Sequence, residues 1–391
     1  MPRWLLPERI SDILPSEARR IEELRRSLLD LYRSYGYELV MPPMIEHADA
    51  LLNGSDSALA LKTFQLVDQL SGRTLGLRAD FSPQVARIDA HLLGRLGATR
   101  LCYSGSVLHT RPAGLTATRE PVHAGVELYG HAGIEADVEV IELMVRSINR
   151  ASTSVVRVDL CHMGVVPALL AGDSGVDEDE IYALLQSKDA PTLAQRLRAR
   201  PLKHGAALLE LMQLHGAARG TGSVLTRARQ ALPALAGVQT ALEQLDRLVR
   251  SPVWDRLTGV ELLIDLADLR SDRYHNGISF AAYVDGLGSA VARGGRYDGI
   301  GSVFGRARAA TGFSIELREL ASLANTEEPV SAIAAPWSDE VALLATIAQL
   351  RAAGRVVIQA LPGHESEVQE FACNEELYLD AGHWRLRAIP H

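Results

Sequence analysis

Apolar side chains recur at helical spacing across residues 16–35, from Ile21 to Leu31. Ser16 suits the N-cap of such a helix, because a serine hydroxyl accepts a hydrogen bond from a free backbone N–H. Gly36 suits its end, because glycine tolerates the left-handed conformation. The pattern therefore predicts an amphipathic helix near the start of the chain.

Short segments with period-two alternation or β-branched side chains follow this helix and predict strands. The first segment ends at Pro42-Pro43, since proline lacks the backbone N–H that a strand donates. The expected strands lie at residues 37–41, 74–77, 99–104, 126–129, 155–160, 261–265, 278–284 and 289–293. Helical spacing predicts helices over residues 83–95, 135–150 and 315–324.

Between about residues 165 and 255 the apolar positions fall almost wholly at helical spacing, which predicts a helical insertion. Within it, the run GAARGTGS at residues 216–223 superficially suggests a phosphate loop. The run lacks the lysine that would reach the phosphates, and no predicted strand precedes it. We therefore expect a flexible loop at this position.

The composition changes at residues 325–331, NTEEPVS, which are polar and contain proline. We place a domain boundary there, between a core of residues 1–324 and a small α/β domain of residues 331–391. A hairpin is expected around Ala381-Gly382. The other elements expected in the small domain are a strand at residues 332–335, a helix at 339–353 and a strand at 355–360.

Composition narrows the class of protein. The chain has 391 residues, of which 47% are hydrophobic and 23% charged, which is enough to bury a large core. No segment approaches the roughly 18 to 20 apolar residues that span a bilayer, and the start lacks a signal sequence, so we expect a cytoplasmic protein. Three cysteines without a CxxC pair and twelve histidines without an HExxH pattern predict neither a disulfide framework nor a metal site. The net charge of −8 argues mildly against a surface built for nucleic acid.

Two acidic residues stand where chemistry is expected. Asp80 lies between a predicted strand and a helix beginning near Pro83, where an acid can simply stabilise the helix N-terminus. Glu127 lies in mid-strand among apolar neighbours. Burying a carboxylate there is costly unless it is paired, so Glu127 indicates a cationic partner such as a ligand ammonium group.

Two later runs add ring and hydroxyl groups. YHNGISFAAYVDG at residues 274–286 contains Tyr274 and His275, and ARGGRYDGIG at residues 292–301 contains Tyr297. Each run alone is ordinary strand and turn chemistry. Together with the two acids they predict a pocket for a small zwitterion with a polar ring.

Five collinear segments resemble the histidyl-tRNA synthetase group of class II synthetases. They cover the chain from the first helix to about residue 323, and their order makes the resemblance specific. The segments read SYGYELVMPPMIE, LRADFSPQVARI, GSVLHTRPAGLTATREPVHAGVELYG, ARGGRYDGI and TGFSIELREL. The resemblance implies an α+β fold: a class II synthetase-like core with a mostly antiparallel sheet flanked by helices, a helical insertion and a small C-terminal α/β appendage.

The sequence departs from the synthetase pattern where ATP phosphates are bound. His109 stands where the second motif carries an arginine, and the third motif reads Glu316 and Glu319 where the family has a glycine and an arginine. Arg318 is one residue out of register and is expected to point elsewhere. Activation of an amino acid depends on positive charge around the phosphates, so we expect no catalytic residues here and a lost adenylation activity.

The amino-acid side of the pocket departs less. The resemblance implies a histidine-binding site in which Asp80 and Glu127 face the amino acid and His123 replaces a glutamine. Arg270 occupies the position of the family's catalytic arginine. The implied histidine-binding residues are Asp80, Glu127, His123, Arg270, Tyr274, His275 and Tyr297, with no cofactor and no metal.

The C-terminal domain is too short for the anticodon-binding domain of the synthetases, so we expect no tRNA partner. The combination resembles the regulatory subunits of ATP phosphoribosyltransferase, the first enzyme of histidine biosynthesis. That resemblance implies a homodimeric core that assembles with a short catalytic subunit, as a hetero-octamer, activates it and mediates feedback inhibition by L-histidine. Two other interpretations stay open: an active histidyl-tRNA synthetase, and a stand-alone histidine-binding paralog.

Overall fold

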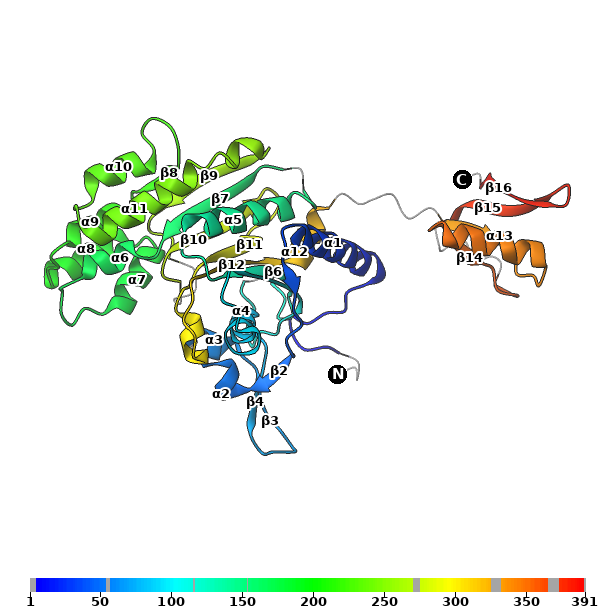
Figure 1. Cartoon of the computed structure of the whole chain (residues 1–391), viewed down its shortest axis with the longest axis horizontal. Coiled ribbons are helices and arrows are strands. Elements are labelled where there is room, and N and C mark those ends of the chain that lie inside the picture. Colours follow the sequence, from blue (N-terminus) through cyan, green and yellow to red (C-terminus); the bar gives the residue numbers. More distant parts are fainter. Residues whose placement is uncertain are drawn as a thin grey trace. The chain divides into compact units, whose positions relative to one another are not determined.

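The computed structural model describes residues 5–53, 57–114, 117–152, 154–269, 275–324, 332–364 and 373–389. The chain divides into two compact units, residues 1–323 and residues 324–391 (Figure 1). In the described ranges, no helix combines the length and the apolar character that a membrane span requires.

The described part of the larger unit is built on a nine-stranded sheet (Figure 1). Only the β1–β5 and β7–β9 pairs among its strands are parallel, which confirms the expected α+β class with a mostly antiparallel sheet. In spatial order the strands are β1 (Glu38–Leu39), β5 (Thr99–Ser106), β6 (Val122–Tyr129), β12 (Ala310–Glu316), β11 (Ala292–Arg296), β10 (Ile278–Val284), β7 (Val156–His162), β9 (Val260–Asp265) and β8 (His215–Ala217).

Helices α1 (Pro15–Ser34), α5 (Ile134–Ile148) and α12 (Leu317–Leu323) cover one face of this sheet. The amphipathic helix expected at the start of the chain is confirmed, and it buries Leu28 completely. The expected N-cap was wrong. The helix begins at Pro15, whose fixed φ suits a first helical position, so Ser16 already lies inside the helix.

The opposite face carries α4 (Ser82–Arg87), which continues as the π-helical turn η1 (Ile88–Leu93) and ends at Gly94 with a φ of 58°. The sequence predicted one helix over residues 83–95 and did not distinguish these two parts. Beside them lies a small sheet in the order β2 (Ile45–His47), β4 (Thr74–Leu77), β3 (Gln65–Val67), with the short helices α2 (Ala48–Leu51) and α3 (Ser57–Lys62).

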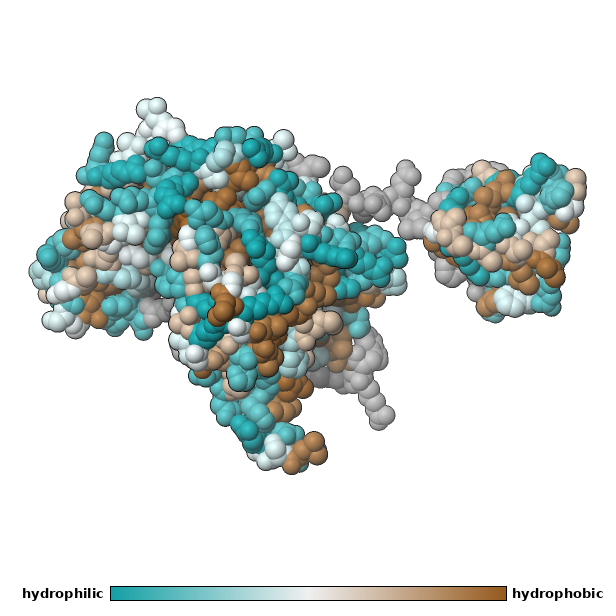
Figure 2. All heavy atoms as spheres, in the orientation of Figure 1, coloured by the Kyte–Doolittle hydropathy of each residue, from teal (hydrophilic) through white to brown (hydrophobic). Residues whose placement is uncertain are grey.

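The β3–β4 hairpin projects from the unit (Figure 2), and its turn, DQLSGR at residues 68–73, is polar except for Leu70. Val67 and Leu70 lie in this hairpin, and the side chain of Leu70 is 98% exposed. A fully exposed leucine at a projecting tip contributes nothing to the core of the chain itself.

The insertion is helical, as expected, with one difference. Residues His215–Ala217 form β8, which pairs with β9 at the edge of the large sheet, so the expectation of a flexible loop over residues 216–223 was wrong at its start. Ser223 at its end caps the next helix. The helices are α6 (Val165–Leu170), α7 (Glu178–Gln186), α8 (Ala190–Ala199), α9 (Gly205–Leu211), α10 (Val224–Ala231) and α11 (Ala236–Val249), followed by a 3-10 turn (Trp254–Arg256).

Two expectations near residue 300 are corrected. Strand β11 spans Ala292–Arg296 rather than residues 289–293, and the helix expected at residues 315–324 begins only at Leu317. The residues before it form β12, whose side chains are buried along nearly its whole length. A strand buried on both faces shows no period-two alternation, so the pattern did not reveal it.

The smaller unit forms a four-stranded sheet packed on one helix. Ile333, Leu343 and Ile347 lie at its core, with Leu377 from a neighbouring strand. At the expected hairpin, Ala381 and Gly382 have φ values of 45° and 84°, the left-handed pair that a tight two-residue turn requires. The elements are β13 (Ala332–Ala335), α13 (Val341–Ala352), β14 (Val356–Gln359), β15 (Cys373–Asp380) and β16 (His383–Ala388), in the sheet order β14-β13-β15-β16.

A buried ion pair fixes β11 to α5. The Arg296 guanidinium donates to one carboxylate oxygen of Asp137 at 2.7 and 3.1 Å, and both side chains are less than 10% exposed. Burial raises the pKa of Asp137, while the charge of Arg296 opposes that rise. The pair holds the turn that follows β11 against the helix layer.

We expect Asp137→Ala to lower the free energy of unfolding by about 3–5 kcal/mol, because it leaves the Arg296 charge buried without its partner. Urea denaturation followed by circular dichroism measures this change. Glu135→Ala, on the same helix but 64% exposed, is the matched control and should change stability by less than about 1 kcal/mol. Equal losses in the two variants would contradict the assignment.

Candidate functional site

A cavity of about 800 Å³ opens on the face of the large sheet that α4 covers. It brings together five of the seven residues that the sequence singled out, and each of them lines its wall. Arg270 and Tyr274, the other two, lie outside the described residues. The five lining residues are Asp80, His123, Glu127, His275 and Tyr297.

Glycines clear the floor of the cavity. Gly312 on β12 pairs with Glu127 on β6, and a Cβ atom at Gly312 would lie only 1.7 Å from a carboxylate oxygen of Glu127. A Cβ atom at Gly125 would lie 2.4 Å from the hydroxyl of Tyr103. No real Cβ tolerates such distances. The two glycines therefore leave the space in which the Glu127 and Tyr103 side chains lie across the sheet.

Hydroxyl groups hold the Glu127 carboxylate. The Ser82 hydroxyl donates to one oxygen at 2.7 Å, the Tyr103 hydroxyl approaches the same oxygen at 3.5 Å, and the Tyr297 hydroxyl donates to the other oxygen in a short bond. Glu127 is 1% exposed and forms no ion pair with any described residue. Burial therefore raises its pKa to about 8, against the lowering effect of the hydroxyls, and the nearby Asp80 raises it further.

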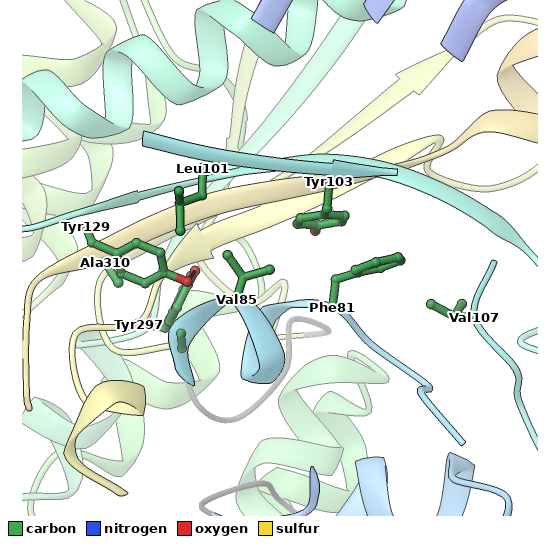
Figure 3. Packing of buried hydrophobic residues seen from close by; sticks show 9 residues of the cluster. Phe81, Val85, Leu101, Tyr103, Val107, Tyr129, Tyr297 and Ala310 are labelled. Carbon is green, nitrogen blue, oxygen red and sulfur yellow. Dashed lines mark hydrogen bonds between the residues drawn. The ribbon is translucent and has the colours of Figure 1, made fainter. Parts of the chain in front are cut away.

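Aromatic rings pack in the buried core beside Glu127. Phe81 and Tyr103 stack with ring centroids 4.3 Å apart, and Tyr129 meets Tyr297 edge to face at 6.5 Å. Figure 3 shows Tyr103, Tyr129 and Tyr297 around Val85 on α4. These contacts fix the rings by packing, so their hydroxyls are already in place when the cavity is empty.

Arg78 positions the turn that carries Asp80. Its guanidinium lies 3.8 Å above the Phe81 ring and donates to the backbone carbonyls of Ser106, at 2.7 Å, and Pro42, at 2.9 Å. The half-buried Asp80 carboxylate lies 3.4 Å from the backbone N of Ser82. The segment between β4 and α4 is therefore held on both sides of its acidic residue.

Two neutral imidazoles line the wall above the glycine floor. Burial lowers the pKa of His123 to about 3, and its Nδ1 is buried without a hydrogen-bond partner among the described residues. His109, which replaces the synthetase arginine, contacts the carbonyl of Ala79 through Nε2 at 3.0 Å, and burial lowers its pKa as well. At neutral pH neither ring supplies a positive charge to the cavity.

The outer wall of the cavity, which we define as Thr118, Glu316 and Glu319, contains acidic rather than basic groups from β12 and α12. The Glu316 carboxylate accepts hydrogen bonds from the backbone N–H groups of Val122, at 3.2 Å, Arg318, at 3.1 Å, and Glu319, at 2.8 Å. Burial raises the pKa of Glu316, which these bonds oppose. The backbone N–H groups at the junction of β12 with α12 are therefore already hydrogen-bonded to a carboxylate of the chain itself.

Arg318 points away from the cavity, as expected from its register. Its guanidinium donates to the carboxylate of Glu17 on α1 at 2.5 Å and to the hydroxyl of Ser11 at 3.2 Å. The cations that do line the cavity in the described residues are Lys62 and Arg293.

Sequence reasoning missed Ser82, Lys62 and Arg293, which line the cavity, and Tyr103, whose hydroxyl approaches Glu127 behind it. The DFSP turn was a usable signal for Ser82, because Ser82 follows Asp80 by two positions in the same turn. Tyr103 offered no such signal, since only the pairing of β5 with β6 brings it beside Glu127. In the described part of the chain, no group of three or more histidine, cysteine or acidic side chains is arranged to hold a metal ion.

We expect Glu127→Gln to change how stability depends on pH. In the folded wild type the Glu127 pKa is about 8, whereas an unfolded carboxyl titrates near its ordinary value of 4.5. Between these values only the folded state keeps the proton, so wild-type stability should fall by up to about 1.4 kcal/mol per pH unit from this group.

Chemical denaturation of both proteins at pH 5, 6, 7 and 8 measures this difference. The advantage of the glutamine variant should grow steadily with pH. Parallel stability curves for the two proteins would show that Glu127 titrates normally.

The chain matches known proteins over nearly its full length. A histidyl-tRNA synthetase family model covers residues 9–320, and a model of the ATP phosphoribosyltransferase subunit HisZ C-terminal domain covers residues 330–387. The ATP phosphoribosyltransferase regulatory subunit of Ralstonia nicotianae is 54% identical over 98% of both chains. The regulatory subunit of Janthinobacterium sp. is 55% identical over the whole of both chains.

Solved structures agree with the fold. The structure of an ATP phosphoribosyltransferase regulatory subunit/histidyl-tRNA synthetase from Bacillus halodurans superposes with a TM-score of 0.79 at 26% identity, over 91% of this chain and 92% of that one. Histidyl-tRNA synthetase from Nostoc sp. superposes with a TM-score of 0.72 at 18% identity, over 99% and 94% of the two chains. The expected class II synthetase-like core is confirmed, and the chain belongs to the family of ATP phosphoribosyltransferase regulatory subunits.

Proposed function

We propose that this chain activates a separate, short catalytic subunit that joins ATP to phosphoribosyl pyrophosphate, and that L-histidine bound in the cavity shifts the complex to an inhibited state. The observation that carries the proposal is the contrast within one cavity. Its floor presents a buried carboxylate suited to a cationic ligand, while its outer wall presents carboxylates where a nucleotide triphosphate would need cations.

Histidine suits the inner part of this cavity. A ligand ammonium group would meet the carboxylates of Asp80 and Glu127, and its arrival would replace the proton that Glu127 holds in the empty site. His123 and His275 would lie around the imidazole with Tyr297 as a wall, since the rings of His275 and Tyr297 meet edge to face at 6.1 Å. We assign Arg270 and Tyr274 to the same site from the sequence alone.

The outer wall supports a loss of adenylation. Glu316 already satisfies three backbone N–H groups, Arg318 is committed to Glu17, and His109 is neutral at physiological pH. A triphosphate at this wall would therefore meet the carboxylates of Glu316 and Glu319, and the charge that develops on its α-phosphorus would go without compensation from these residues.

We propose that the chain works in the cytoplasm as a homodimer within a hetero-octamer that contains the catalytic subunit and no tRNA. Exposed apolar side chains support the dimer. Leu39 and Met41 follow helix α1, while Leu92 and Leu96 flank Arg95, which forms an ion pair with Glu38 beside them. Such a cluster of exposed apolar groups is typical of a surface that another chain covers.

The direct test is phosphoribosyl transfer to ATP by a purified short catalytic subunit, measured with and without this chain across a histidine titration. We expect strong activation that histidine reverses. We expect no histidine-dependent ATP–pyrophosphate exchange by this chain alone. Absence of activation together with rapid exchange would instead establish an active synthetase.

The Glu127→Ala variant tests the cavity assignment. It removes the carboxylate that would face the ligand cation, and loss of such a contact costs about 1.5–3 kcal/mol, or roughly 10- to 150-fold in histidine affinity. Isothermal titration calorimetry measures the affinity, and the transfer assay should show relieved inhibition with activation largely intact. Glu135→Ala, at an exposed site, should bind histidine normally. Unchanged inhibition of the Glu127→Ala complex would overturn the assignment.

A further inference from the structure

Residues 8–17 lead from the outer wall of the cavity into the first turn of helix α1. The carbonyl oxygen of Arg9 accepts hydrogen bonds from the backbone N–H of Arg119 at 2.9 Å and from the hydroxyl of Thr118 at 3.2 Å. The Arg119 guanidinium also donates to the carbonyl of Glu8 at 3.3 Å. Because Thr118 lines the cavity, one end of the segment is fastened directly to the outer wall.

The backbone is strained at this fastening. Arg9 has a φ of 61°, in the left-handed region that side chains other than glycine seldom adopt. A residue held there costs on the order of 1 kcal/mol or more and persists only when its surroundings fix it. The two hydrogen bonds accepted by the Arg9 carbonyl supply that constraint.

The other end of the segment is fastened through Arg318. The guanidinium of Arg318 contacts Ser11 and Glu17, and Glu17 lies in the first turn of α1. Arg318 stands between Glu316 and Glu319, which both line the cavity. The segment is thus tied to the outer wall at two separate places, and its last residues are the start of α1.

Short paths join these ties to two residues that line the cavity, the proposed ligand contact His123 and His109. Glu316 pairs with His123 across the sheet, and its carboxylate accepts a hydrogen bond from the backbone N–H of Val122, the neighbour of His123. On the other path, the backbone N–H of His109 donates to the carbonyl of Arg119 at 2.8 Å. Each path is continuous through hydrogen bonds or the chain itself.

We propose that residues 8–17 form a strap that carries the effect of cavity occupancy to helix α1. The inference rests on the proposed function, in which histidine is the occupant. A ligand that shifts His109 displaces the fastening at Arg9, and a ligand that shifts His123 displaces the fastening at Arg318. Because residues 14–18 already belong to or cap α1, through the bond from the N–H of Ala18 to the carbonyl of Leu14, the first turn of α1 moves with them.

Transmission through the strap requires that the two states of the complex differ in the Arg318–Glu17 contact. A ligand shifts an equilibrium only by the difference in its affinity for the two states. Loss of the contact should therefore reduce that difference and leave binding of histidine to the chain itself intact. This separates a transmitting contact from a binding one.

The test uses Glu17→Gln in the full chain assembled with its catalytic subunit. Two quantities are measured: the dissociation constant of histidine, and the ratio of transfer activity without histidine to that at saturating histidine. We expect the dissociation constant to stay within about twofold and the ratio to fall at least about threefold. Activity without histidine should be unchanged, because Glu17 touches neither the ligand nor a reacting group.

Glu22→Gln is the matched control. Glu22 lies on the same helix and pairs with Arg25 and Arg26, but it has no contact with the cavity wall. It should leave both quantities at their wild-type values. The double variant Glu17→Gln/Arg318→Gln should lose no more than Arg318→Gln alone, since Arg318→Gln already breaks the contact with Glu17 together with the one to Ser11.

The outcomes separate the two proposals. If wild-type chain bound no histidine, the proposed function would fail and the strap with it. If wild type were inhibited normally and Glu17→Gln kept the wild-type ratio, the strap alone would be overturned. A drop of equal size in Glu22→Gln would also overturn it, because the effect would then follow from any weakened ion pair on α1.

Discussion

The geometry of the cavity depends on one buried carboxylate, Glu127, which has no paired cation among the described residues. Transfer of an isolated carboxylate from water to a protein interior is among the costliest changes in a fold, and Glu127 meets that cost with hydroxyl donors and a retained proton. Ser82, Tyr103 and Tyr297 come from α4, β5 and the turn after β11. Three distant segments are therefore placed by the need to surround one side chain, and the glycine floor exists because that side chain lies flat on the sheet.

Much of the fold could be predicted from the sequence because it rests on local pattern. The strands at residues 74–77, 278–284 and 332–335 have the predicted bounds, and the helix after Leu14 differs by one residue. The acid in mid-strand pointed to Glu127 for a physical reason, the cost of its burial. The pattern of apolar positions did not predict strands that depend on neighbours distant in the sequence. Strand β12 is buried throughout and shows no alternation, and β8 exists only because β9 offers it an edge.

For the candidate site, too, residues that stand out in the local sequence could be predicted, and residues placed by distant strand pairing could not. Position in the chain drew attention to Asp80 and His275, which do line the cavity with Glu127. Register decided the rest. Tyr103 lies beside Glu127 only once β5 and β6 are paired. The hydrogen bonds that three backbone N–H groups donate to the Glu316 carboxylate depend on the junction of β12 with α12. From the sequence, Glu316 was expected to repel a phosphate group. The structure adds that its carboxylate accepts hydrogen bonds from backbone N–H groups.

The distance along the chain between members of this site sets an order of events during synthesis. Tyr297 lies 170 positions after Glu127 in the chain. Glu316, whose carboxylate accepts a hydrogen bond from the backbone N–H of Val122, lies 194 positions after Val122. At about 5–20 residues per second, a ribosome needs roughly 10–40 s to bridge such a gap. Strand β6 therefore emerges with its acidic side chain and an unpaired edge, while the helical insertion, which is made in the interval, consists of local contacts. The nascent core remains open until β12 is made, and this interval is when it most needs protection from association with other chains.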